Sequence, residues 1–303
     1  MINSMLTIFT CPKPFNDPHI RLIQRNAIRS WTLLVPRPRM ILMGGEPGSE
    51  EAAGEFGAEV VAGVERSSKG TPLVSSLFRL AEERSGAGEV LAYVNTDIIL
   101  MQDFIQAVGV CAGLGRGFLM VGRRWDLEVK EELDFGSAGW DQRLRERARR
   151  EGRLHAASGL DYFVYRRGLW RDIPGFALGR FSWDNWLLAE AGRIGAMRID
   201  ASQTVMAIHQ EHGYASTGFA DALEAQKSEE AEMNRRLAGD SMDNTLDCEY
   251  CLAGCRVRRA TDPAHIARRA KRFVFNSCRR MCPPKLRSFA SRIGLWAQKR
   301  GMI

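Results

Sequence analysis

The sequence predicts an α/β fold in which a mostly parallel sheet is flanked by helices on both faces. Short apolar runs of strand type alternate with amphipathic helical segments over the first 120 residues, a rhythm typical of parallel sheets. The chain has 303 residues, of which 45% are hydrophobic and 26% are charged, as in ordinary globular proteins. It also lacks the roughly 18 uninterrupted apolar residues that a membrane-spanning helix requires. We therefore expect a large globular body.

The elements of this body are expected in a regular order. The first strand covers residues 5–10, and a helix follows over residues 17–34, where apolar residues recur at close to helical spacing. Pro36 and Pro38 end that helix. The remaining strands are expected at residues 39–44, 59–62, 90–94 and 118–121, with helices at residues 47–56, 72–86 and 103–114.

The second half of the chain is less regular. Residues 123–139 are polar and interrupted, and they predict a loop that carries Trp125 and Asp126. Residues 141–151 are expected to form a charged surface helix. Two further strands are expected, one ending at Tyr165 after a run of small residues and one over residues 204–208.

The strand at residues 90–94 ends on two polar side chains, Asn95 and Asp97. Strands in open α/β sheets present their carboxyl ends to ligands. An Asn-x-Asp motif at this place directs two oxygen ligands, one of them anionic, into a crevice. Hard divalent cations that carry phosphates need such oxygens, so the motif indicates a metal-phosphate site.

A second motif places an acid between two tryptophans, in the segment Phe181 to Leu188. Ser182 suits a helix N-cap, and Asp184 would then lie in the first turn and favour the helix dipole, which is a purely structural explanation. The neighbouring Trp183 and Trp186 favour a functional one. A carboxylate beside apolar rings is partly desolvated, which raises its pKa and makes it a better general base.

A third motif contains two of the five histidines, His209 and His212, beside Glu211. A histidine at a strand end is often a hydrogen-bonded core residue. Two of them within four residues indicate a metal ligand, and imidazole suits Mn²⁺ better than Mg²⁺. We expect His209 to be the ligand because it leaves its strand directly, with His212 in reserve.

In this order the three motifs resemble the inverting nucleotide-diphospho-sugar glycosyltransferases of the GT-A fold, over roughly residues 5–215. The resemblance implies a metal ion, Mn²⁺ or Mg²⁺, that Asp97 and His209 hold on the donor diphosphate. It implies that Asp184 is the general base that deprotonates the acceptor hydroxyl. Asn95 replaces the first acid of the family's DxD signature. That acid contacts the ribose or the metal in the family, and we expect Asn95 to contact only the ribose.

The resemblance also implies further site residues and a division of the chain. The expected donor-binding residues are Thr10, Lys13, Thr71, Asn95 and Asp97, and the expected acceptor-binding residues are Gly159, Asp161 and Trp183. Two alternatives stay open: Lys13 is a phosphate contact or a solvated lysine, and Asp161 binds a sugar hydroxyl or caps its strand. The GT-A-like catalytic domain is expected over residues 1–215, with a donor half over about 1–122 and an acceptor half over about 123–215, then a helical connector over 216–255 and a basic helical tail over 256–303.

Charge supports the last boundary. Residues 256–303 hold 14 Lys and Arg but one acid, Asp262, which is a net charge of +13, whereas the other 255 residues carry 29 Lys and Arg against 35 acids, which is −6. Within the tail, residues 286–297 have an apolar stripe at helical spacing, which is typical both of an interfacial membrane helix and of a helix that packs on the enzyme body. The tail therefore predicts a possible anionic membrane surface as a partner.

The expected partners are a nucleotide-sugar donor and a glycan or lipid-linked acceptor, in polysaccharide biosynthesis. Two other functions remain open: nucleotidyl transfer onto a sugar phosphate, and nucleic-acid binding through the tail, which is disfavoured because no known nucleic-acid-binding module is present. Seven cysteines without a secretory signal predict reduced thiols in a cytoplasmic protein, which could lie on the inner face of the membrane. The cysteines at 248, 251, 255, 278 and 282 could bind zinc or be buried thiols.

Overall fold

A computed structural model describes residues 6–213 and 222–281 of the chain. Contacts between residues divide the chain into two units, Met1–Arg258 and Arg259–Ile303. In the described part of the chain, no helix is both long enough and apolar enough to span a membrane.

The first unit is built on a mostly parallel central sheet, as the sequence predicts. Within the described residues the strand order is β13-β12-β10-β6-β9-β4-β1-β2-β3. All the pairings of known direction are parallel, except that β9 runs antiparallel to both β4 and β6. The strands are β1 (Leu6–Thr10), β2 (Arg39–Met43), β3 (Glu59–Val61), β4 (Val90–Val94), β6 (Phe118–Val121), β9 (Tyr162–Arg166), β10 (Met197–Asp200), β12 (Tyr250–Ala253) and β13 (Arg256–Arg259).

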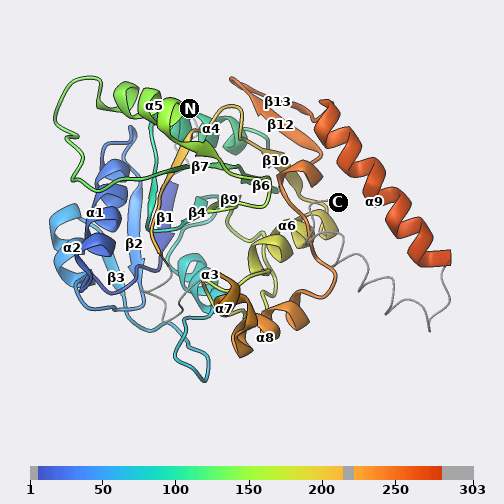
Figure 1. The fold of residues 1–303 in the computed structure, drawn as a ribbon, viewed down its shortest axis with the longest axis horizontal. Helices are drawn as coiled ribbons and strands as arrows, with labels where there is room; N and C mark the ends of the chain where they lie inside the picture. The colour runs from blue at the N-terminus through green and yellow to red at the C-terminus, as the bar shows by residue number, and fades with distance from the viewer. Residues whose placement is uncertain (1–5, 214–221, 282–303) are drawn as a thin grey trace. The chain divides into compact units, whose positions relative to one another are not determined.

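Helices cover both faces of this sheet. Successive residues of a strand point to opposite faces, so Ile8 of β1 joins one apolar core and Phe9 joins the other. The first core is covered by α1 (Pro18–Thr32), α2 (Ser49–Phe56) and α4 (Gln102–Ala112), and the second by α3 (Val74–Glu83), α6 (Trp183–Arg193) and the end of α8 (Glu229–Ala238). Figure 1 shows α3, α6, α8 and the short α7 (Ala222–Lys227) below the strands, with α4 and α5 (Trp140–Glu151) above them.

A second, smaller sheet was not predicted. Its strand order is β5-β11-β7-β8, formed by β5 (Ile98–Ile99), β11 (Ala207–Gln210), β7 (Arg124–Leu127) and β8 (Arg153–Leu154). The predicted loop over residues 123–139 is therefore wrong at β7. The sequence Arg-Trp-Asp-Leu hides this strand because two of its four residues are charged, whereas a strand is normally recognised by its apolar residues.

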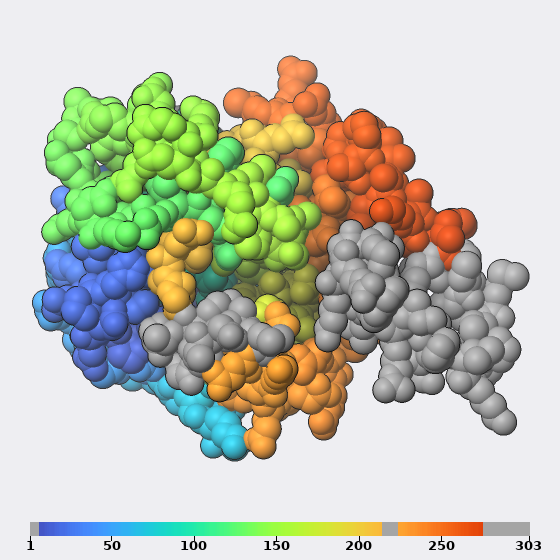
Figure 2. Space-filling view, in the orientation of Figure 1, coloured from blue at the N-terminus to red at the C-terminus, as the bar shows by residue number. Residues whose placement is uncertain are grey.

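The strand near the histidines also differs from its prediction. It begins at Ala207 and ends at Gln210, so His209 lies inside the strand and does not follow it. The segment after β11 reaches the surface, where Figure 2 shows it in amber beside the blue N-terminal residues. There His19 Nε2 donates to the carbonyl oxygen of Glu211 at 3.2 Å.

The expected connector over residues 216–255 is not purely helical. It contains α7 and α8, but its short apolar run Tyr-Cys-Leu-Ala forms β12, which pairs with β10 in the central sheet. The expectation is corrected because an apolar run of four residues suffices for a strand when a sheet edge is open to it.

In the second unit the described part of the basic tail contains α9 (Pro263–Met281), whose first turn is capped by Asp262 accepting from His265 N at 3.2 Å. The predicted apolar stripe over residues 286–297 lies outside the described residues. The same is true of Cys282, and the side chain of Cys278 is not described either, so the zinc hypothesis stays a prediction. Of the described cysteines in this set, Cys248 and Cys251 are buried and Cys255 is exposed.

Candidate active site

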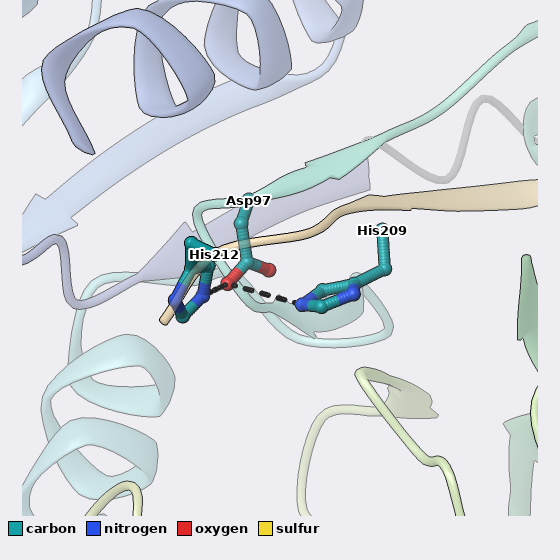
Figure 3. A group of neighbouring side chains, drawn as sticks. All are labelled: Asp97, His209 and His212. Atoms are coloured by element: carbon teal, nitrogen blue, oxygen red, sulfur yellow. Dashed lines mark hydrogen bonds and ion pairs between the residues drawn. The ribbon is translucent and has the colours of Figure 1, made fainter. Parts of the chain in front are cut away.

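Three potential metal ligands converge where β4 and β5 meet β11. The ligand atoms of Asp97, His209 and His212 all lie within 4.8 Å of one another. His212 Nε2 is 3.0 Å from Asp97 Oδ2, and His209 Nε2 is 3.8 Å from the same oxygen. Figure 3 shows the two rings approaching this oxygen from opposite sides. The structure therefore unites the motif at Asp97 with both histidines.

The hydrogen bonds of the other ring nitrogens decide what the two rings offer to Asp97. His212 Nδ1 is 3.0 Å from the carbonyl oxygen of Gly213, which can only accept, so this nitrogen donates. His209 Nδ1 likewise donates to Asp126 Oδ1 at 3.2 Å. In its neutral form each ring then directs the lone pair of Nε2 toward Asp97. Acceptors that face one another repel unless a proton or a metal ion lies between them.

The remaining oxygen of Asp97 supports a metal ion. Asp97 Oδ1 is buried and has no hydrogen-bond partner among the described residues, which is costly for a carboxylate oxygen. Burial raises the pKa of Asp97, but the neighbouring His209, His212 and Lys13 outweigh it and hold the pKa well below its ordinary value. Asp97 is therefore an ionised carboxylate with an unused oxygen. One carboxylate and two imidazoles form a ligand set that suits Mn²⁺.

The next layer of the site is a buried network around Asp161. Asn95 Nδ2 donates to Asp161 Oδ1 at 2.6 Å, and Arg124 Nη1 donates to Asp161 Oδ2 at 2.6 Å. Asn95 Oδ1 in turn accepts from the Tyr93 hydroxyl at 3.0 Å. The side chains of Asn95 and Asp161 thus bind each other, and both carboxylate oxygens of Asp161 already have protein partners.

Asp126 forms the other half of this network. It is 4% exposed, and its pKa lies far below the ordinary value because hydrogen bonds from His209 and His155 outweigh the effect of burial. Arg124 links it to Asp161, since Arg124 Nε donates to Asp126 Oδ1 at 2.9 Å. Asp161, Arg124 and Asp126 thus form a continuous series of bonded charged side chains. The series ends at His209, beside Asp97.

Asp184 stands in the first turn of α6, as predicted. Burial raises its pKa to about 6, against a hydrogen bond from the backbone N–H of Asn185, and Asp161 and Arg124 are among the charges that act on it. The carboxylate therefore belongs to the same electrostatic cluster. Ser182 is the N-cap residue, but its φ of 84° is left-handed and its side chain makes no capping hydrogen bond, so the predicted capping contact is absent from this helix.

The tryptophan beside this acid is part of the core. Trp183 is 5% exposed, and its ring lies 5.5 Å from the Tyr93 ring and 5.2 Å from the Phe163 ring. Its predicted contact with the acceptor stays untested, and its packing favours a role in supporting the start of α6.

The predicted donor residues lie at the ends of strands but differ in their contacts. Thr10 Oγ1 lies 2.6 Å from Thr96 Oγ1, which ties the ends of β1 and β4 together. The backbone of Lys13 is held by Gln24, and burial lowers the pKa of its ammonium group while Asp97 and Asp17 oppose this. Lys13 thus acts electrostatically on Asp97. Thr71 belongs to another cluster, since its hydroxyl donates to Glu230 Oε2 at 2.9 Å.

Gly159 serves a neighbour within the protein. A Cβ at this position would come within 2.3 Å of His155 Cδ2, so the ring of His155 occupies the space that a side chain would need. The predicted close approach of this backbone to a ligand stays untested, and the structure shows that it closely approaches an imidazole.

Sequence reasoning did not find Arg124, Asp126 and His155 as site residues. Asp126 was noted only as part of a loop. Asp126 is identified as a site residue by the register of the small sheet, in which His209 pairs with both Ile98 and Asp126.

The chain matches no protein-family model and no curated protein. Among solved structures it is similar to glucosyl-3-phosphoglycerate synthase from Mycobacterium tuberculosis. The structure of that enzyme with Mn²⁺, UDP-glucose and phosphoglyceric acid is 16% identical with a TM-score of 0.45, covering 78% of this chain and 80% of that one. The structure with Mg²⁺ and UDP is 14% identical with a TM-score of 0.41, covering 78% and 80%. Likeness at this level does not establish what this chain binds, and its function rests on its own residues.

Proposed function

We propose that this chain is a metal-dependent glycosyltransferase that moves a sugar from a nucleotide-diphosphate donor to an acceptor hydroxyl. The convergence of Asp97, His209 and His212 at the edge of the sheet carries this proposal. A metal site alone fits many reactions. Together with a carboxylate whose pKa is about 6 in the same electrostatic cluster, it fits a reaction in which a hydroxyl loses its proton while a diphosphate leaves.

On the donor side, Asp97, His209 and His212 would hold Mn²⁺ or Mg²⁺. The bound ion supplies charge that neutralises the diphosphate of the donor and of the leaving group. Lys13 adds positive charge near Asp97. Thr10, Asn95 and Thr71 are the other proposed donor residues. The hydroxyls of Thr10 and Thr71 already bond to Thr96 and Glu230, which favours indirect roles, and Asn95 also holds Asp161 in place.

On the acceptor side, Asp184 is the proposed general base. Its carboxylate takes the proton of the acceptor hydroxyl as the hydroxyl oxygen attacks the anomeric carbon and the bond from that carbon to the diphosphate breaks. A single displacement of this kind inverts the anomeric configuration. Gly159, Asp161 and Trp183 are proposed to shape the acceptor region, and the buried contacts of Asp161 and Trp183 favour indirect roles.

The described part of the tail has an exposed apolar face that supports a membrane-docking proposal. On α9, Ile266, Phe273 and Val274 share one face at helical spacing and are 51%, 74% and 58% exposed. Arg269 and Lys271 flank this stripe, and Arg268 and Arg272 add positive charge elsewhere on the same helix. We propose that the tail docks on an anionic membrane surface, where a lipid-linked acceptor of polysaccharide biosynthesis is reached.

Sedimentation with liposomes tests this docking. The full chain should sediment with phosphatidylglycerol vesicles at low salt and less at high salt, and a Phe273→Ser, Val274→Ser variant should sediment less. Equal sedimentation of the wild type and the variant, or none with either, would contradict the membrane proposal and leave the transferase proposal standing.

Binding of UDP- and GDP-sugars with and without Mn²⁺ tests the proposed function. A donor that binds only with Mn²⁺, together with a product whose anomeric configuration is inverted by NMR, would support it. Release of inorganic diphosphate from UTP or GTP in the presence of a sugar phosphate would favour the alternative, nucleotidyl transfer onto that sugar phosphate. Binding of oligonucleotides but of no nucleotide sugar would favour a nucleic-acid-binding protein.

A further inference from the structure

The register of the small sheet aligns His209 and Asp126 of the site in one row with Ile98 and Arg153. His209 of β11 is paired with Ile98 of β5, next to Asp97, and on its other side with Asp126 of β7. Asp126 is paired in turn with Arg153 of β8. Paired residues of neighbouring strands project to the same side of a sheet. The backbone therefore sets Asp126 directly behind His209, as seen from Asp97.

We infer that Asp126 is a positioning residue that fixes the ring orientation and the tautomer of His209, so that Nε2 faces the metal. This inference rests on the metal site of the proposed function. Asp126 Oδ1 accepts from His209 Nδ1 at 3.2 Å, which leaves the lone pair of Nε2 on the side of Asp97. A carboxylate behind a metal-binding histidine selects the tautomer and makes the imidazole a stronger ligand.

Four donors hold Asp126 itself in place. Oδ1 accepts from His209 Nδ1 and Arg124 Nε, and Oδ2 lies 2.7 Å from His155 Nδ1 and 3.3 Å from Arg153 Nη2. Because both oxygens are engaged from two sides, rotation of the carboxylate breaks several bonds at once. A side chain this well anchored can keep a neighbouring imidazole in one orientation.

His155 and Gly159 support this arrangement. The backbone N–H of His155 donates to the carbonyl oxygen of Arg124 at 2.9 Å, which holds the histidine against β7. Its ring occupies the space that Gly159 leaves open, so its Nδ1 meets Asp126. Asp126, His155 and Gly159 thus form a second layer of the site behind His209. This layer is built from β7 and from the segment between β8 and β9.

Spectroscopy on the wild-type protein tests the inference without any variant. Long-range ¹H–¹⁵N spectra of protein labelled with ¹⁵N-histidine distinguish the two tautomers of a neutral imidazole. We expect His209, assigned through His209→Gln, to carry its proton on Nδ1. A His209 signal with the proton on Nε2 in the metal-free protein would overturn the inference.

The variant Asp126→Asn tests the consequence for metal binding. An amide keeps the shape of the carboxylate but turns one acceptor into a donor, so it cannot accept from both His209 and His155. We expect the Kd for Mn²⁺, measured by electron paramagnetic resonance on the full chain, to rise about 10- to 100-fold. The tautomer signal of His209 should change in the same variant.

Asp243→Asn is the matched control. Asp243 is also a buried carboxylate bound to an arginine, with Arg198 Nη1 at 2.6 Å, but it is outside the contacts of the metal site described above. We expect this variant to keep the Mn²⁺ affinity of the wild type within about twofold. That change is small beside the loss of about 10- to 100-fold expected when an orienting carboxylate is removed. If Asp126→Asn also keeps the wild-type affinity and tautomer, or if both variants lose affinity equally, Asp126 does not position His209.

The two proposals fail in different ways. Wild-type protein that binds Mn²⁺ through His209 but transfers no sugar would contradict the proposed function and leave the role of Asp126 intact. Wild-type protein that does not bind Mn²⁺ would overturn both the metal site and the role of Asp126 in it.

Discussion

The imidazole of His155 lies directly over Gly159, at a distance that leaves no room for a side chain: a Cβ on Gly159 would be 2.3 Å from His155 Cδ2. Since His155 also contacts Asp126, this glycine is linked through two side chains to the histidine beside Asp97.

We therefore expect Gly159→Ala to weaken Mn²⁺ binding severalfold, because the added methyl group displaces His155 from Asp126. The measurement is a titration with Mn²⁺ followed by electron paramagnetic resonance. Gly109→Ala in α4 is the control, since an added Cβ meets no described residue within 4 Å and alanine is the better helix former. Equal Mn²⁺ affinity in Gly159→Ala and the wild type would show that His155 is not needed to hold Asp126.

Both histidines should be required for the metal site. His209→Ala and His212→Ala should each weaken Mn²⁺ binding, because the Nε2 atom of each ring is directed at the same oxygen of Asp97. Isothermal titration calorimetry measures the loss, and melting in chelator checks the fold. His19→Ala is the control, since His19 bonds only to the backbone of Glu211 among its described contacts. Unchanged Mn²⁺ affinity in either variant would remove that histidine from the ligand set.

The pKa of Asp184 predicts the pH dependence of the reaction. A general base acts in its ionised form, and burial raises the pKa of this carboxyl to about 6. We expect kcat/KM to rise about tenfold per pH unit below pH 6 and to level off above it. Asp184→Asn should lower kcat by about 10²–10⁴ and still bind the donor. A profile that is flat between pH 5 and 8, or near-normal transfer by the variant, would exclude Asp184 as the base.

The same carboxylate should make the protein less stable at high pH. In the unfolded chain Asp184 ionises near its ordinary pKa of 3.8, but in the folded protein it resists ionisation until about pH 6. The folded state therefore loses stability as the pH rises from 4 to 6, by about 1–3 kcal/mol, and the loss is complete above pH 6. Asp184→Asn should melt higher than the wild type at pH 7.5 and by a smaller margin at pH 4.5. A margin that does not change with pH would contradict the raised pKa.

The central sheet could be predicted because each of its strands in the first half carries a local signal. β1, β2 and β4 are apolar runs between turns, and the helices between them have one apolar face, so their order alone indicates parallel pairing. Asp97 and Asp184 could be predicted for the same reason, since each marks the end or the beginning of such an element. β12 was missed because it is short and follows a helical stretch.

The small sheet, and with it half of the site, could not be predicted. Its strands have two to four residues, and β7 and β8 carry charged side chains, so no periodicity reveals them. The contact between His209 and Asp126 joins residues 83 positions apart through strand pairing. Such a contact depends on tertiary register, which is not encoded in either segment alone. The choice of His209 over His212 as the metal ligand stays a prediction, since both rings reach Asp97.

The most direct test of the metal site is anomalous diffraction at the manganese edge, from crystals soaked with Mn²⁺ and either UDP or GDP. The proposed function predicts one strong peak at about 2.0–2.3 Å from Asp97, His209 Nε2 and His212 Nε2, with the diphosphate oxygens of the nucleotide completing its coordination. A nucleotide bound without a peak at these three residues, or a peak elsewhere in the protein, would contradict a metal-dependent donor site.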